Sequence, residues 1–216
     1  MESEKKFKYD LYNIYLYNLH TLINSYHYKY RWVDLSKERF FNHSGHSFTN
    51  FNIHDKFLQQ YKEDKKQLGK AILRDGTYTP FFYFKNKDNY NMIMLGKHRL
   101  YSLLMCQLDK PLPRKFLFVE YPHDPLDGKT VHEQKITPTL PLYFFDHGIK
   151  EPEPRYPDCE DKINIVFLCT GDYLSDFFYT EKTQPSPWLN SPEAFEEFLQ
   201  KPFEPNLNPR SKNIEI

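Results

Sequence analysis

The stretch MIMLGKHRLYSLLM, residues 92 to 105, carries the strongest structural signal in this chain. A short apolar run ends at Gly96, and hydrophobic residues then return three and four positions apart. This change of period predicts a buried strand, a tight turn, and a helix from Lys97 to about Leu108. Four leucines would form the buried face of that helix: Leu100, Leu103, Leu104 and Leu108.

The residues before this stretch predict a helix followed by the first strand of a β-hairpin. A helix from about Asp55 would be capped by that aspartate and stopped by Gly76 in a left-handed conformation. A strand over 80–84 begins at Pro80, which is a tolerated place for proline. An Asn- and Asp-containing turn then leads to the partner strand, residues 90–95.

The remaining elements are expected on either side of this hairpin. Residues 31–35 and 115–120 predict short strands, and 163–169 predicts another. Residues 9–30 have roughly helical spacing, although their tyrosine content leaves a strand open. Ser191 and the proline after it predict the start of a C-terminal helix.

Together these elements predict an α+β fold with a small mixed sheet. We expect residues 1–120 to form the core with an N-terminal extension. Residues 121–216 are rich in proline, and we expect an irregular extension that packs on the same core. No internal repeat divides the chain of 216 residues further.

Composition excludes several classes of protein. Lys and Arg total 29 and Asp and Glu total 29, so the zero net charge argues against a broad nucleic-acid surface. Three cysteines do not suit a disulfide framework, and Cys106 is expected in the core. The charged first residues do not resemble a secretory signal, and no apolar run could span a membrane. We therefore expect a cytoplasmic protein.

The turn at Gly96 combines three features that favour an anion. The start of a helix exposes unpaired backbone amides and the positive end of its dipole. Gly96 lets a ligand approach the backbone, while Lys97, His98 and Arg99 add donors. These cations are unfavourable at a helix N-terminus unless an anion such as phosphate offsets them. The alternative is that Lys97 and Arg99 are solvated while His98 packs against a neighbouring loop.

The order of these segments resembles the ParB/sulfiredoxin superfamily. The resemblance rests on two features. Residues 67–84 predict a helix, a glycine turn and a strand that begins with proline, and the G-x-H-R turn at Gly96 begins the next helix, with a small residue, Ser102, following it. Residues 32–35 look like the short first strand of that family. The match covers about residues 31 to 120.

The resemblance implies a phosphate-binding turn. Its members bind nucleotides or phosphorylated substrates there, and by position the turn and its border would be Gly96, Lys97, His98, Arg99, Thr79 and Pro80. His98, Glu38 and Asp34 would be the catalytic residues, with Asp75 a further acidic candidate. Lys97 stands where sulfiredoxins need a cysteine, which excludes their reductase chemistry. The Pro-rich extension holds no convincing DNA-binding helices, unlike partition proteins.

The implied function is nucleotide-dependent phosphotransfer or NTP hydrolysis, with Mg²⁺ accompanying ATP or CTP. One alternative is a non-catalytic module that senses a nucleotide and meets a protein partner through residues 121–216. Another is a ParB-like nuclease or DNA-binding protein, which the neutral charge disfavours. Neither a membrane nor a resident metal site is expected.

Other titratable clusters are interpreted as loops. His43, His46 and His54 could reach one metal ion, but a loop that closes over a bound ligand is the favoured interpretation. A polar loop is also favoured for 120–134, although five of its residues could do acid–base work or bind a divalent ion: His123, Asp124, Asp127, His132 and Glu133. Asp172 and Asp176 could line a pocket or mark a turn.

Overall fold

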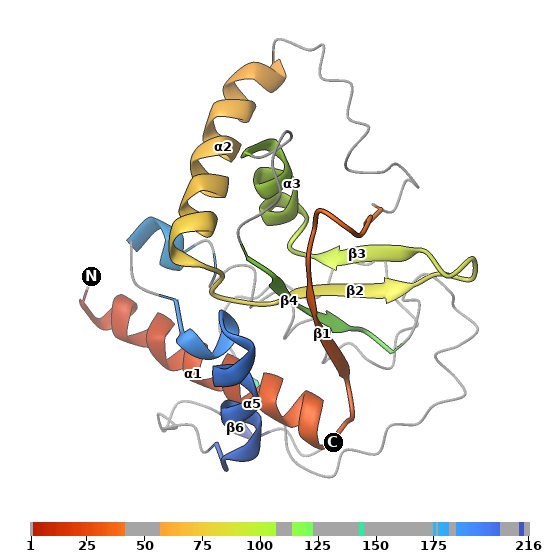
Figure 1. Ribbon diagram of the computed structural model, residues 1–216. Coiled ribbons are helices and arrows are strands. Elements are labelled where there is room, and N and C mark those ends of the chain that lie inside the picture. Colours follow the sequence, from red (N-terminus) through yellow and green to blue (C-terminus); the bar gives the residue numbers. More distant parts are fainter. Residues whose placement is uncertain are drawn as a thin grey trace.

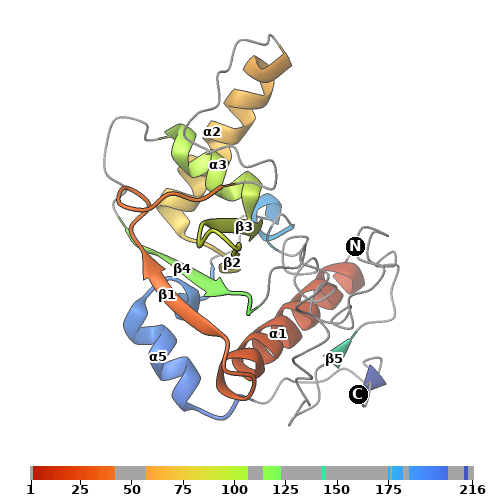
Figure 2. The same ribbon diagram turned by 90° about the vertical axis from the view of Figure 1, so that its right-hand side faces the viewer.

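The fold is α+β, with a four-stranded mixed sheet between two layers of helices (Figures 1 and 2). It comes from a computed structural model. The structure describes residues 2–41, 57–106, 114–122, 143–144, 175, 177–181, 185–203 and 212–213. Several predictions concern residues outside these ranges: those for 42–56 with Asp55 and the three loop histidines, for 107–113 with Leu108, for 123–142 and 163–169, and for Asp172 and Asp176.

The sheet has the strand order β1-β4-β2-β3. Its strands are β1 (Lys29–Val33), β2 (Phe81–Lys85), β3 (Asn91–Leu95) and β4 (Phe116–Glu120). β2 and β3 form the predicted antiparallel hairpin, β1 pairs antiparallel with β4, and β2 runs parallel to β4. The hairpin turn is ordered by Asn86, whose side chain accepts from the amides of Asp88 and Tyr90 at 3.0 and 2.9 Å.

Two layers of helices cover the two faces of the sheet (Figure 2). One layer holds α2 (Phe57–Asp75) and α3 (Lys97–Cys106), and the other holds α1 (Glu2–Asn24) and α5 (Pro192–Gln200). Successive residues of a strand point to opposite faces. Phe81 and Tyr83 therefore join the core under α2 and α3, while Phe82 and Phe84 join the core under α1 and α5. Among the helices described, none is long and apolar enough to cross a membrane.

The N-terminal region forms a helix and a strand rather than one element. α1 covers most of the predicted 9–30 segment and begins earlier, at Glu2. The helix ends at Asn24, and His27 then adopts a left-handed backbone with φ of 58° before β1 begins at Lys29. The predicted first strand is confirmed, but it starts two residues earlier than the sequence indicated.

The chain after β1 crosses the face of the sheet that carries α2 and α3. Phe40 packs against Phe118 and Tyr83, with ring centroids 4.5 and 5.7 Å apart. Phe41 then makes a parallel bridge to Met92 at the opposite edge of the sheet. This crossing places Glu38 on the same side of the sheet as α3.

Helices α2 and α3 approach closely through small residues. A Cβ atom on Gly69 would lie only 2.2 Å from the carbonyl oxygen of Ser102. The Ser102 hydroxyl turns back to donate to the carbonyl of His98 at 2.7 Å. Cys106 is half-buried in the same contact and its thiol donates to the Lys66 carbonyl at 2.9 Å. This partial burial raises the pKa of the thiol. Cys106 therefore lies in the contact between the two helices and is only half-buried, whereas the sequence predicted a core position.

The described part of the C-terminal extension packs on α1. Its helical turn η2 (Pro187–Leu189) precedes α5, whose predicted cap is confirmed: the Ser191 hydroxyl accepts from the Ala194 amide at 3.3 Å. Four of its side chains join the core of that layer: Phe178, Leu189, Phe195 and Phe198. Two further strands, β5 (Tyr143–Phe144) and β6 (Lys212–Asn213), pair antiparallel with each other.

Candidate functional site at the start of helix α3

The turn between β3 and α3 requires a glycine. Gly96 has a φ of 88°, in the left-handed region that L side chains avoid. A Cβ atom there would lie 2.6 Å from Cδ1 of Phe81 and 3.0 Å from Nη2 of Arg99. The backbone of the turn therefore fits against the first residue of β2 and against the side chain of Arg99.

The first turn of α3 concentrates positive groups. Lys97, His98 and Arg99 occupy it, and no acidic residue does. His98 is exposed and Lys97 is half-buried, so both can meet a ligand from solvent. Cations at a helix N-terminus oppose the helix dipole, so this arrangement is unfavourable for the helix by itself.

Arg99 is buried and links α3 to the residues before β2. It is 3% exposed, and its guanidinium lies 5.0 Å from the centre of the Phe81 ring. Nη1 donates to the carbonyl of Thr79 at 2.5 Å, and Nη2 makes a longer contact of 3.4 Å to the carbonyl of Pro80. The structure thus brings Thr79 and Pro80 beside the turn. Two donors of Arg99 bind protein carbonyls, whereas the sequence analysis expected them to bind phosphate.

The hydroxyl of Thr79 is buried, and none of the residues that the structure describes forms a hydrogen bond with it. The residue is 1% exposed, and its own carbonyl is bonded to Arg99. A buried polar atom left unsatisfied costs roughly 1–3 kcal/mol, which an additional acceptor or donor would recover. Thr79 therefore places a polar atom beside the turn for which the described residues offer no partner.

The structure places the three acidic candidates in three different settings. Asp34 accepts from the amide and hydroxyl of Ser36 at 3.0 and 2.6 Å, which lowers its pKa and shapes the turn after β1. Glu38 is held by Arg31, with its two carboxylate oxygens 2.7 and 2.6 Å from Nη1. Asp75 ends α2 beside Gly76 and pairs with Arg74, which lowers the pKa of Asp75.

The charges of Asp75 and Arg99 both affect the pKa of the Tyr179 phenol. Burial is the main cause that raises the pKa of the Tyr179 phenol, and the positive charge of Arg99 opposes this rise while Asp75 adds to it. Sequence reasoning considered Asp75 only from its position at the end of a helix.

A polar network that the sequence did not reveal lies on the same face of the sheet. Arg31 donates through Nε to the Tyr83 hydroxyl at 3.0 Å, and that hydroxyl donates to Glu120 at 2.8 Å. Glu38 completes the network through Arg31. Arg31, Tyr83 and Glu120 occupy inward positions on three neighbouring strands, and no local motif marks them.

Because of this network, stability should fall in strong alkali. Burial, followed by the hydrogen bond to Glu120, raises the pKa of Tyr83 to about 12 from 10.0, while Arg31 opposes the rise. A phenol with a raised pKa stabilises the fold fully below pH 10.0, and this contribution is lost as pH rises past about 12. Urea unfolding measures the free energy of unfolding of the wild type and of Tyr83→Phe. The difference between the two should become smaller as the pH rises from about 9 to about 12. An equal gap at both values would contradict the assignment.

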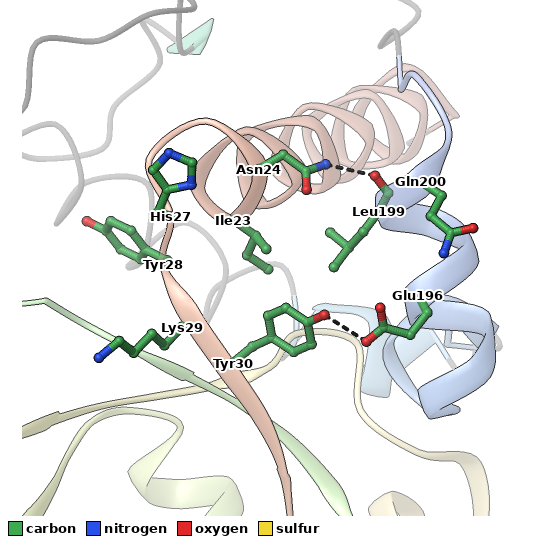
Figure 3. A pocket seen from close by; sticks show the side chains of 9 residues that line it. All are labelled: Ile23, Asn24, His27, Tyr28, Lys29, Tyr30, Glu196, Leu199 and Gln200. Carbon is green, nitrogen blue, oxygen red and sulfur yellow. Dashed lines mark hydrogen bonds between the residues drawn. The ribbon is translucent and has the colours of Figure 1, made fainter.

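A hollow of about 680 Å³ opens on the other face of the sheet, between the end of α1, β1 and α5 (Figure 3). Four of its lining residues already bind each other in pairs: Tyr30 donates to Glu196 at 2.7 Å, and Asn24 donates to the Leu199 carbonyl at 2.8 Å. Tyr30 packs in the layer of α1 and α5, whereas Phe81 beneath the Gly96 turn packs in the other layer. The hollow is therefore separate from the candidate site.

Within the residues that the structure describes, no three His, Cys, Asp or Glu side chains gather where they could hold a metal ion. Comparison with known proteins gave no match to a family model, to a curated sequence or to a solved structure. The site is defined by its geometry and by the chemistry of its side chains.

Proposed function

We propose that this chain binds the phosphate groups of a nucleotide or another phosphorylated small molecule at the start of α3. The observation that carries the proposal is a first helical turn with three cationic or titratable side chains, no acid, and a buried guanidinium. A phosphate would offset the conflict between these cations and the helix dipole. The alternative required a solvated Arg99, and this residue is 3% exposed.

Each part of the site has a distinct role in this proposal. Backbone amides after Gly96, together with Lys97 and His98, contact the phosphate oxygens. The Thr79 hydroxyl supplies one more polar contact. Arg99 adds its charge and holds Thr79 and Pro80 against the turn.

The proposed reaction is nucleotide-dependent phosphotransfer or hydrolysis. Phosphoryl transfer depends mainly on orientation and charge neutralisation, which a rigid cationic turn can provide. His98, Glu38 and Asp34 remain the proposed acid–base residues, and Asp75 at the end of α2 stays a further acidic candidate. Mg²⁺ would arrive with the phosphates of ATP or CTP and take one or two carboxylates as further ligands.

The ParB/sulfiredoxin fold is part of the same proposal. A helix that stops at Gly76, with φ of 97°, a strand after Pro80, its hairpin partner, and a second left-handed glycine before a helix support it. The proposal also includes a cytoplasmic location and a protein partner for the C-terminal extension.

A nucleotide sensor without turnover is the second candidate. It is favoured by the partners of Glu38 and Asp34, which hold both carboxylates in local contacts. Product formation from ATP or CTP with Mg²⁺ separates the two functions, since a sensor would bind either nucleotide without releasing product.

Thermal shift and calorimetry test the binding site directly. Four common nucleotides and inorganic phosphate are compared on the wild type, on Lys97→Ala/His98→Ala, and on Lys87→Ala in the exposed β2–β3 turn. A bound nucleotide at a hundred times its Kd should add about 2.7 kcal/mol of stability. We expect the double variant to lose roughly tenfold or more in affinity, with Lys87→Ala unchanged. No binding, or equal affinity in the double variant, would refute the proposal.

A further inference from the structure

The connection between α2 and β2, residues 76–80, is buried at every position, and its backbone is bonded by side chains from four distant parts of the chain. Buried loop backbone needs such partners because water cannot supply them. The partners come from α1, α3, the helical turn at 177–181 and the junction of η2 with α5: Tyr12, Arg99, Tyr179 and Asn190.

The side-chain amide of Asn190 binds both backbone groups of Thr77, as the backbone of a neighbouring strand would. Its Oδ1 accepts from the amide of Thr77 at 2.7 Å, and its Nδ2 donates to the carbonyl of Thr77 at 2.9 Å. Nδ2 also donates to the Ser186 carbonyl at 3.0 Å, which fixes the amide in one orientation. A Cβ on Gly76 would lie 2.2 Å from Oδ1, so the chain leaves room for this side chain.

The residues on either side of Thr77 are fixed in the same way. Tyr179 donates to the Gly76 carbonyl at 2.8 Å, and Tyr12 donates to the Tyr78 carbonyl at 2.6 Å. Arg99 binds the next carbonyl, that of Thr79, at 2.5 Å. The buried Thr79 hydroxyl differs from its neighbours in this arrangement, because no group in the described part of the chain bonds to it.

We propose that Asn190 is a positioning residue for the phosphate site. It fixes Thr77, and through the two residues that follow it sets Thr79 against Arg99 and the start of α3. The role of Asn190 in phosphate binding rests on the proposed function. Its effect on the conformation of the Gly96 turn can be measured without any ligand. A positioning role for Asn190 would make the C-terminal extension a necessary part of the site.

The chemistry requires an asparagine. Asn190→Asp keeps the acceptor for the Thr77 amide but loses both donors and places a negative charge beside two carbonyl oxygens. Asn190→Ala leaves the buried amide and carbonyl of Thr77 without these partners. Ser191→Ala is the matched control, because it removes the cap of α5 at the adjacent position, at a cost of about 1 kcal/mol, and touches nothing in residues 76–80.

Hydrogen exchange of the full-length chain gives the first readout. In Asn190→Ala, the amides of 76–80 and of Gly96 to Arg99 should exchange roughly tenfold faster than in Ser191→Ala. Faster exchange confined to 76–80, or equal exchange at Gly96 to Arg99 in both variants, would overturn the inference.

Affinity for the nucleotide or phosphate that the wild type binds gives the second readout. We expect Asn190→Ala to bind about tenfold more weakly, Asn190→Asp at least as weakly, and Ser191→Ala within about twofold of the wild type. Equal losses in Asn190→Ala and Ser191→Ala would overturn a positioning role. If the wild type binds no phosphate compound, the proposed function fails, and the exchange rates at Gly96 to Arg99 still decide whether Asn190 controls the turn.

Discussion

Gly69→Ala should lose about 2–3 kcal/mol of unfolding free energy, even though alanine is the better helix former. The added Cβ would lie 2.2 Å from the carbonyl oxygen of Ser102 and 2.5 Å from Sγ of Cys106. The cysteine side chain can rotate away, but the backbone carbonyl can move only if α2 and α3 separate. That separation would expose core beneath both helices, since Ile72 and Leu103 are fully buried there.

The sign of the change in unfolding free energy distinguishes an effect of packing from an effect of helix propensity. In an exposed helix, replacing glycine by alanine stabilises by roughly 0.5–1 kcal/mol. Urea unfolding measures the sign, and Lys70→Ala, on the next residue of the same helix and exposed, should change stability by less than about 0.5 kcal/mol. A more stable Gly69→Ala variant would show that the two helices do not meet at this residue.

Arg99→Met should have the largest combined effect on stability and binding. It keeps much of the buried side-chain volume but removes both donors to the Thr79 and Pro80 carbonyls. We expect a loss of about 2–4 kcal/mol, because buried carbonyls are left without partners. Phosphate affinity should fall about a hundredfold, since the charge and the position of Thr79 are lost together.

Arg99→Lys and Arg114→Met complete this experiment. A lysine places one compact ammonium where the guanidinium reaches two carbonyls, so it should restore only part of the stability. Arg114 makes an exposed, long contact of 3.4 Å to the Arg74 carbonyl, and the loss of that contact should cost less than about 0.5 kcal/mol. Urea unfolding and calorimetry on all three variants provide the measurement. Comparable stability of Arg99→Met and Arg114→Met would contradict the structural role of Arg99.

Local sequence patterns predicted the parts of the fold that depend on neighbouring residues. The hairpin, helix α3 and the stop at Gly76 each follow from a periodicity or a turn residue within a few positions. The cap of α5 at Ser191 is equally local. The pairing of β1 with β4 and of β2 with β4 could not be deduced, because it joins segments far apart in the chain.

The candidate site divides in the same way. The turn at Gly96 and the proximity of Thr79 could be expected from the sequence, because a hairpin puts the residues before β2 beside the residues after β3. The network of Arg31, Tyr83 and Glu120 could be found only with the strand order known, since each is one polar residue at an inward position of a separate strand. Asn190 carried no signal, because an asparagine after a Ser-Pro-Trp segment is an ordinary turn residue.

The bond between Asn190 and Thr77 also constrains how the protein is made. The two residues are 113 positions apart, so during synthesis the ribosome needs roughly 6–23 seconds to reach Asn190 after Thr77 at ordinary elongation rates. Until then the nascent hairpin and α3 can pair locally while the backbone beside them lacks its final hydrogen bonds.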